Sequence, residues 1–234
     1  MNKVKVSAAL LLSQIITVGV VRAEYAAGYT WDWQPDYMTN MLMSTPVNPA
    51  VDSEGSAVWT YAYNVNDAST ATIRNTGSQT MGIGLKNGTS YVWAQNTGSW
   101  SSAAYFRATP STDAHWVMNP GADVGADAQL AQLVWTAPTD ATIKISGDIV
   151  NASTSGNGVL WYLDSYQSGT YTELGSGSVN GVSTALDVTI SVSTGDQIIF
   201  SADGNGGILG DPTQYNVTYE LLPQSSRISL IIIR

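Results

Sequence analysis

The sequence predicts an all-β chain that folds as an antiparallel two-sheet β-sandwich of the jelly-roll type. Short runs of alternating apolar and polar residues, rich in β-branched and aromatic side chains, recur along it, and Gly, Asn, Asp and Ser separate them. No stretch places apolar residues at sustained helical spacing. Many short strands at such spacing are typical of a sandwich or a jelly roll.

The predicted strands follow one another from residue 57 to residue 222. Tight hairpins are expected where Asn precedes Gly, at Asn87, Asn157 and Asn180, because this pair supplies the left-handed backbone that such turns need. The strands are predicted over residues 57–64, 81–86, 90–94, 103–108, 115–118, 129–136, 141–149, 158–166, 170–179, 185–192, 196–202 and 215–222.

The ends of the chain differ from this pattern. Residues 1–23 have the features of a secretory signal peptide, with Lys3 and Lys5 before an apolar stretch from Ala8 to Val21. The alternatives are cleavage nearer Ala26 or Ala27 and an uncleaved anchor. Residues 24–50 carry Trp, Tyr and Pro without periodicity and are predicted to wrap over the sandwich, or alternatively to form a linker. The sandwich itself is assigned to residues 51–223, and residues 224–234 form a short C-terminal tail. We therefore expect a secreted protein, extracellular or at the cell surface, with no membrane span in its mature chain.

Composition excludes several classes of protein. The chain has 18 acidic and 9 basic residues, a net charge of −9, and only 12% charged residues. Removal of residues 1–23 takes away three cations, so the mature chain would have 6 − 18 = −12. A nucleic-acid binder needs a basic face, which these few cations do not build. Because there is no Cys, the fold depends on its core and not on disulfides.

A search for catalytic groups yields no catalytic residue. His115 is the only histidine and there is no Cys, so nucleophilic catalysis lacks its usual partners. Glycoside hydrolysis needs two facing carboxylates, and neither Glu173 nor Glu220 has a distinctive flanking sequence. The sequence favours a protein that is not an enzyme, with a polysaccharide hydrolase or lyase as the weaker alternative.

One Gly-rich segment, residues 203–211, is a candidate cation site. Asp203, Asn205 and Asp211 offer the oxygen ligands that Ca²⁺ takes, so calcium is the one cofactor the sequence suggests. Asp123 and Asp127 form a weaker second candidate. The alternative interpretation, which the sequence favours, is a solvated turn whose Asp and Asn residues serve its backbone conformation.

Aromatic side chains are the best candidates for a binding surface, since rings bounded by polar groups suit the faces and hydroxyls of sugars. Strand alternation directs Trp161 and Tyr162 to opposite sheet faces, so only one of them can be core. Trp100, in a loop of small polar residues, is the strongest single candidate. The predicted ligand-binding residues are Trp100, Trp161, Tyr166 and Trp93.

Several motifs in order resemble a bacterial secreted jelly-roll family. They span about residues 48 to 222 and comprise Asn48-Pro49, Trp59-Thr60-Tyr61, Asn119-Pro120-Gly121, Trp135-Thr136-Ala137-Pro138, Ile143 to Gly147, Gly158-Val159, Gly195-Asp196 and Asp211-Pro212-Thr213. Many members of that family carry a Pro-Glu-Pro sorting tail, which this chain lacks after Leu222.

The resemblance implies a fold similar to that of carbohydrate-binding modules and a partner that is an extracellular polysaccharide or a cell-surface glycan. The resulting expectation is a secreted, non-catalytic glycan-binding surface or matrix protein. The alternative is a structural extracellular protein that self-associates through sheet edges, with residues 228–233 as an added strand.

Overall fold

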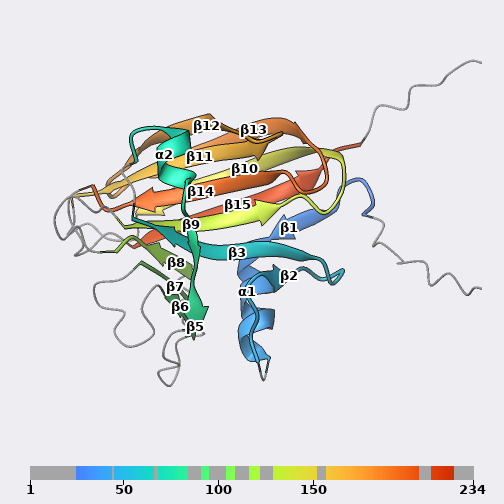
Figure 1. Cartoon of the computed structure of the whole chain (residues 1–234), viewed down its shortest axis with the longest axis horizontal. Helices are drawn as coiled ribbons and strands as arrows, with labels where there is room; N and C mark the ends of the chain where they lie inside the picture. The colour runs from blue at the N-terminus through green and yellow to red at the C-terminus, as the bar shows by residue number, and fades with distance from the viewer. Residues whose placement is uncertain are drawn as a thin grey trace, which may run out of the picture.

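The computed structural model describes residues 25–43, 45–65, 68–83, 91–94, 104–108, 116–121, 129–151, 157–205 and 212–223. In these residues two antiparallel sheets pack against each other, and two short helices lie outside the strands (Figure 1). The predicted all-β fold, a sandwich of jelly-roll type, is confirmed. Neither helix is long and apolar enough to cross a bilayer.

Sheet A forms one layer of the sandwich and contains the longest strand that the structure describes. Its strand order is β13 (Ser183–Val192), β10 (Ala141–Asn151), β15 (Thr213–Leu221), β8 (Trp116–Asn119), β7 (Tyr105–Ala108), β6 (Tyr91–Ala94) and β5 (Gly82–Ile83), with β1 (Thr30–Asp32) paired to β15.

Sheet B forms the second layer. Its strand order is β12 (Thr170–Val179), β11 (Val159–Gln167), β14 (Gln197–Asp203), β9 (Leu130–Thr136), β3 (Ala57–Asn64) and β2 (Ala50–Val51), with β4 (Gln79–Thr80) paired to β3. Each strand predicted from the sequence overlaps one of the structure, and the predictions for 57–64 and 170–179 coincide with β3 and β12.

The core lies between the inner faces of the sheets, as strand alternation requires. Ile143 and Ile145 of β10 are fully buried, and Lys144 between them is only half-buried. From the opposite layer, Trp59 and Trp135 meet the ring of Tyr219 at centroid distances of 5.4 and 5.3 Å. These contacts join β3 and β9 of sheet B to β15 of sheet A.

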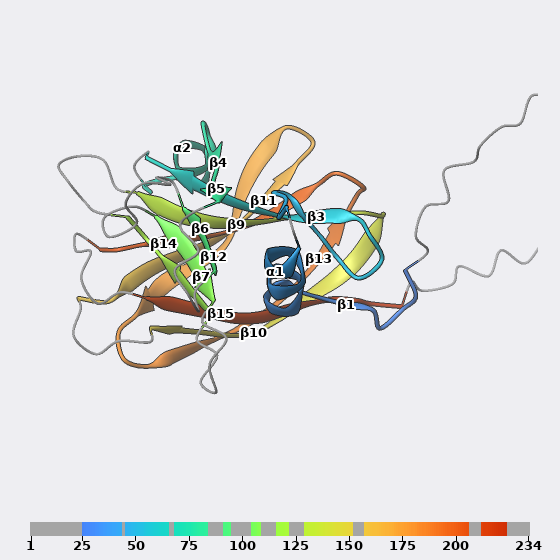
Figure 2. The ribbon, with the colours of Figure 1, turned by 90° about the horizontal axis from the view of Figure 1, so that it is seen from below.

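Helix α1 (Trp33–Leu42) corrects the expectation that no helix would form. It begins at Asp32, whose carboxylate accepts a hydrogen bond from the Gln34 N–H, the usual arrangement of an N-cap. Trp33, Tyr37 and Met41 recur every four residues and are all buried. Figure 2 shows α1 between the β3 side of one layer and the β1 and β15 side of the other.

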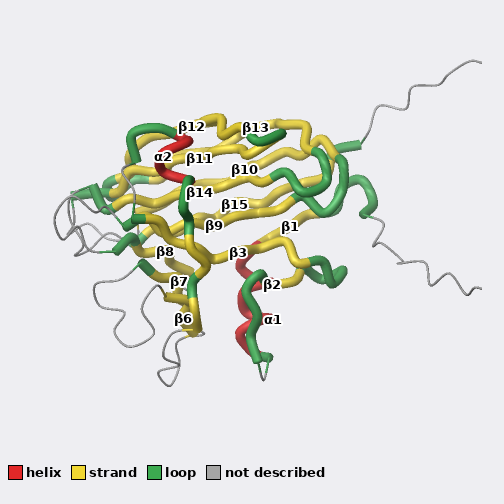
Figure 3. The backbone as a smooth tube through the Cα atoms, in the orientation of Figure 1, coloured by secondary structure: helices red, strands yellow, loops and turns green. Residues whose placement is uncertain are grey.

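Helix α2 (Ala71–Asn75) was also not predicted. It is a helix of five residues that follows β3 in the chain. Thr70 is its N-cap, and the Thr70 side chain accepts a hydrogen bond from the Ile73 N–H. Figure 3 shows α2 as a small helical piece against the strands of sheet B, next to β12 and β11. It contacts β12, so α2 covers part of the outer face of sheet B.

Candidate functional site

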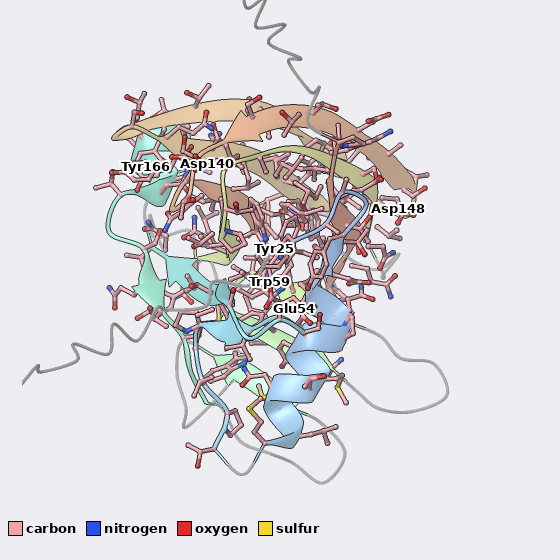
Figure 4. The ribbon with its side chains drawn as sticks, turned by 90° about the vertical axis from the view of Figure 1, so that its right-hand side faces the viewer. Tyr25, Glu54, Trp59, Asp140, Asp148 and Tyr166 are labelled. Atoms are coloured by element: carbon pink, nitrogen blue, oxygen red, sulfur yellow. The ribbon has the colours of Figure 1, made fainter. Side chains whose placement is uncertain are left out.

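The outer face of sheet B, which points away from sheet A, carries a partly exposed pair of aromatic rings. Tyr166 and Tyr171 are directly paired across β11 and β12. Their ring centroids are 4.5 Å apart and their planes are inclined by 37°. Both rings pack on a small apolar cluster that includes Val134 and Ile199 and is separate from the main core. Figure 4 places Tyr166 at the periphery of the molecule.

Strand register defines what surrounds the two rings, because residues directly opposite across an antiparallel pair share a face. Gln197 of β14 lies opposite Tyr166, and Thr136 of β9 lies opposite Gln197. Thr60 of β3 lies opposite Val134. The side chains of Gln197, Thr136 and Thr60 are partly exposed, so amide and hydroxyl groups border the apolar patch beneath the rings.

An arm of the chain, residues 68–78 with α2 within it, covers the neighbouring part of this face. Arg74 of the arm is fully buried. Its Nε and Nη2 donate to the two oxygens of Asp164 on β11, at 2.7 and 2.5 Å. Nη2 also donates to Glu173 Oε2 on β12, at 2.6 Å. The guanidinium carbon lies 4.3 Å from the ring centroid of Tyr162, within the range of a cation–π interaction.

Amide groups complete the attachment of the arm. Asn75 Nδ2 donates to Asp164 Oδ2 at 2.7 Å. Gln132 Nε2 of β9 donates to Asn75 Oδ1 at 2.8 Å and to the carbonyl oxygen of Arg74 at 3.1 Å. The carboxylate of Asp164, which is fully buried, therefore has both a cation and an amide as partners, as a buried charge requires.

The carboxylate of Glu173 lies at the boundary between the arm and the aromatic pair. Its side chain is 43% exposed, and it accepts hydrogen bonds from Ser176 and from Arg74. The Ser176 hydroxyl and then the Arg74 guanidinium lower the pKa of Glu173, so it is ionised at neutral pH. The sequence does not indicate the pairing of Glu173 with Arg74, because the two residues are 99 positions apart along the chain.

Two of the predicted aromatic platforms are instead part of the core. Trp93 is 2% exposed and stacks on Tyr61, with ring planes 11° apart and centroids at 6.0 Å. Trp161 is 6% exposed, and a Cβ at Gly177 would come within 3.0 Å of its indole nitrogen. The glycines of β12 thus make room for the indole, and Tyr162 takes the opposite face. Trp100 lies outside the described residues.

The predicted cation loop is only partly described. Asp203 Oδ1 accepts a hydrogen bond from the Asn205 N–H at 3.0 Å, and Asn205 has a positive φ of 50°. These are the features of an Asx turn. Asp211, Asp123 and Asp127 lie outside the described residues, and so does His115. Within the described part of the chain, no group of three or more His, Cys, Asp or Glu could hold a metal ion. Calcium binding stays a prediction.

Other polar clusters among the described residues have structural roles. Asp52 accepts hydrogen bonds from the Tyr25 hydroxyl at 2.7 Å and from Trp31 Nε1 at 3.0 Å, and so ties the N-terminal segment to the β2–β3 turn. Glu173 and Glu220, the pair considered for hydrolysis, lie on different sheets, in β12 and β15. A pocket of about 160 Å³ is lined by Tyr25, Ala27, Thr139, Asp140, Leu221 and Leu222.

No family model and no curated protein matches the sequence. Among solved structures, the chain is similar to the C-terminal CBM6 of LamC, a marine laminarinase from Zobellia galactanivorans, with 17% identity over 50% of this chain and 87% of that one, and a TM-score of 0.30. It is also similar to a carbohydrate-binding module of Cellvibrio mixtus lichenase 5A in complex with cellotriose, with 15% identity, coverage of 51% and 86%, and a TM-score of 0.28. A third is TmCBM61 in complex with β-1,4-galactotriose, with 14% identity, coverage of 61% and 88%, and a TM-score of 0.30.

Proposed function

We propose that this protein is a non-catalytic, secreted module that binds a polysaccharide on the outer face of sheet B. The observation that carries the proposal is the Tyr166–Tyr171 pair, two partly exposed rings that lie on a sheet face outside the core. Such rings present apolar surface of the kind that packs on the C–H face of a sugar ring.

The polar groups around the pair support the same ligand class. Gln197 provides an amide with both donor and acceptor atoms, and Thr136 and Thr60 provide hydroxyls. Sugar hydroxyls need partners of both kinds at the border of an apolar surface. A chain of sugar units laid along the face would contact the rings and these groups at once, whereas a wholly apolar ligand would leave the polar groups without partners.

The test is binding to a panel of soluble polysaccharides, measured by affinity electrophoresis and then by calorimetry with the best ligand. The double variant Tyr166→Ala, Tyr171→Ala should bind at least about tenfold more weakly, equivalent to about 1.4 kcal/mol of binding free energy. Leu42→Ala is the matched control, because it removes an exposed apolar side chain from α1 and leaves the rings in place.

Two results would contradict the proposal. One is a folded wild-type protein that binds no polysaccharide of the panel. The other is a double variant that binds as tightly as the wild type, which would place the binding surface elsewhere on the molecule. Thermal unfolding of each variant distinguishes loss of binding from loss of fold.

A further inference from the structure

The outer face of sheet B is poor in positive charge. No Lys or Arg occurs in any strand of this sheet. Of the basic residues that the structure describes, Arg107 and Lys144 belong to β7 and β10 of sheet A. Arg74 is therefore the only described cation at the outer face, and it comes from the arm and not from the sheet.

The charge of Arg74 is already compensated. Its guanidinium is fully buried and makes ion pairs with Asp164 at 2.5 Å and with Glu173 at 2.6 Å. Arg74, Asp164 and Glu173 form a trio of one cation and two carboxylates, with a net charge of −1. A bound anion would meet the uncompensated negative charge and not the guanidinium, because the arm covers the guanidinium completely.

The excess negative charge of the trio is exposed beside the aromatic pair. Glu173 follows Tyr171 by two residues on β12, so both side chains belong to the same face. Ser176 and Arg74 hold its two oxygens in place at 2.7 and 2.6 Å, and 43% of the side chain is exposed.

We infer that this face selects neutral polysaccharides over those bearing carboxylate or sulfate groups, and that Glu173 is the residue that sets this selectivity; the inference rests on the proposed glycan binding. An ionised, oriented carboxylate is an acceptor for sugar hydroxyls. The same carboxylate repels an anionic sugar at the same position, and no accessible described cation offsets the repulsion.

Matched pairs of polysaccharides that share a backbone test the inference: hydroxyethyl cellulose with carboxymethyl cellulose, methyl-esterified polygalacturonan with polygalacturonate, and dextran with dextran sulfate. The wild type should bind the neutral member of at least one pair and bind its charged counterpart much more weakly. Glu173→Gln should improve binding of the charged member about threefold to fivefold at low salt, the effect of one unit charge about 5 Å away in water. It should not improve binding of the neutral member, whose hydroxyls lose a charged acceptor and keep only the neutral amide oxygen.

Two controls accompany the variant. Asp187→Asn removes one carboxylate from β13 of sheet A and should alter neither member of a pair. Raising the salt concentration for the wild type should improve binding of the charged member only, since salt screens the repulsion, and this result does not depend on any variant.

The outcomes separate the two proposals. If charged and neutral members bind equally, if only charged members bind, or if Glu173→Gln changes neither, the charge selectivity is refuted while glycan binding stands. If no member of any pair binds, both the selectivity and the proposed function fail.

Discussion

Arg74 is the residue that attaches the arm, residues 68–78, to the outer face of sheet B. Its guanidinium and the carboxylate of Asp164 are both fully buried, so each is the main compensation for the other's charge. Arg74→Met keeps an apolar stem but leaves Asp164 without a cation. We expect this variant to lose about 3 to 5 kcal/mol of unfolding free energy, measured by urea denaturation, because an unpaired buried charge is costly.

The double variant Arg74→Met, Asp164→Leu is the matched comparison. It removes both charges together, so it should recover much of the stability that Arg74→Met loses. A single variant that costs less than about 1 kcal/mol would contradict this account, since surface ion pairs have such values. It would mean that water reaches Asp164 when the arm loses its guanidinium.

At the scale of elements, α1 carries a carboxyl whose ionisation opposes folding. Asp36 lies in its first turn and accepts a hydrogen bond from Trp59 Nε1 at 2.8 Å. Burial, aided by the charges of Asp52 and Asp32, raises the pKa of Asp36 to about 6, although the Trp59 hydrogen bond lowers it. The native state therefore holds this proton at a higher pH than the unfolded chain does.

The sign of the pH effect follows from that difference. Between the unfolded pKa, about 3.9, and about 6, the native state binds more protons than the unfolded state, so this group's contribution to stability falls as pH rises. Asp36→Asn removes the dependence. Relative to the wild type, the variant should gain about 1 to 2 kcal/mol between pH 4 and pH 8, a value reduced for partial solvent screening. If Asp36→Asn changes the free energy of unfolding by the same amount at pH 4 and at pH 8, the raised pKa of Asp36 is refuted.

The elements also show what the sequence can predict. The strands were predicted because alternation and Asn-Gly turns are local signals, as in β3 and β12. Helix α1 was missed although Asp32 is a capping residue and Trp33, Tyr37 and Met41 follow at intervals of four; a Pro in the first turn and the aromatic content concealed the pattern.

The candidate site was predictable only in part, because exposure depends on partners that are distant in sequence. The sequence predicts Tyr166 as a binding residue, but nothing local indicates that its ring pairs with that of Tyr171 across β11 and β12. Trp161 is buried because Gly177 lies opposite it. The ion pair of Arg74 and Asp164 joins residues 90 positions apart, and no spacing rule reaches that far.

At the scale of the whole molecule, the described core joins both sheets and α1 into one unit. Trp135 meets Trp31 of β1 at a centroid distance of 5.2 Å and Tyr219 of β15 at 5.3 Å. Trp33 of α1 donates to the carbonyl oxygen of Tyr215 at 2.7 Å. Because these contacts cross between layers, neither layer keeps its buried surface when the other opens.

Unfolding should therefore be a single transition, with tryptophan fluorescence and far-UV circular dichroism giving the same urea midpoint. The proposed binding face lies on the outer side of sheet B and shares no ring with this core, so the Tyr166→Ala, Tyr171→Ala variant should keep one coincident transition even if it no longer binds polysaccharide. Separate midpoints for the two probes in the wild type would show that the layers unfold independently. Separate midpoints in the double variant alone would show that the aromatic pair supports the fold, and the function of this face would then no longer be separable from its stability.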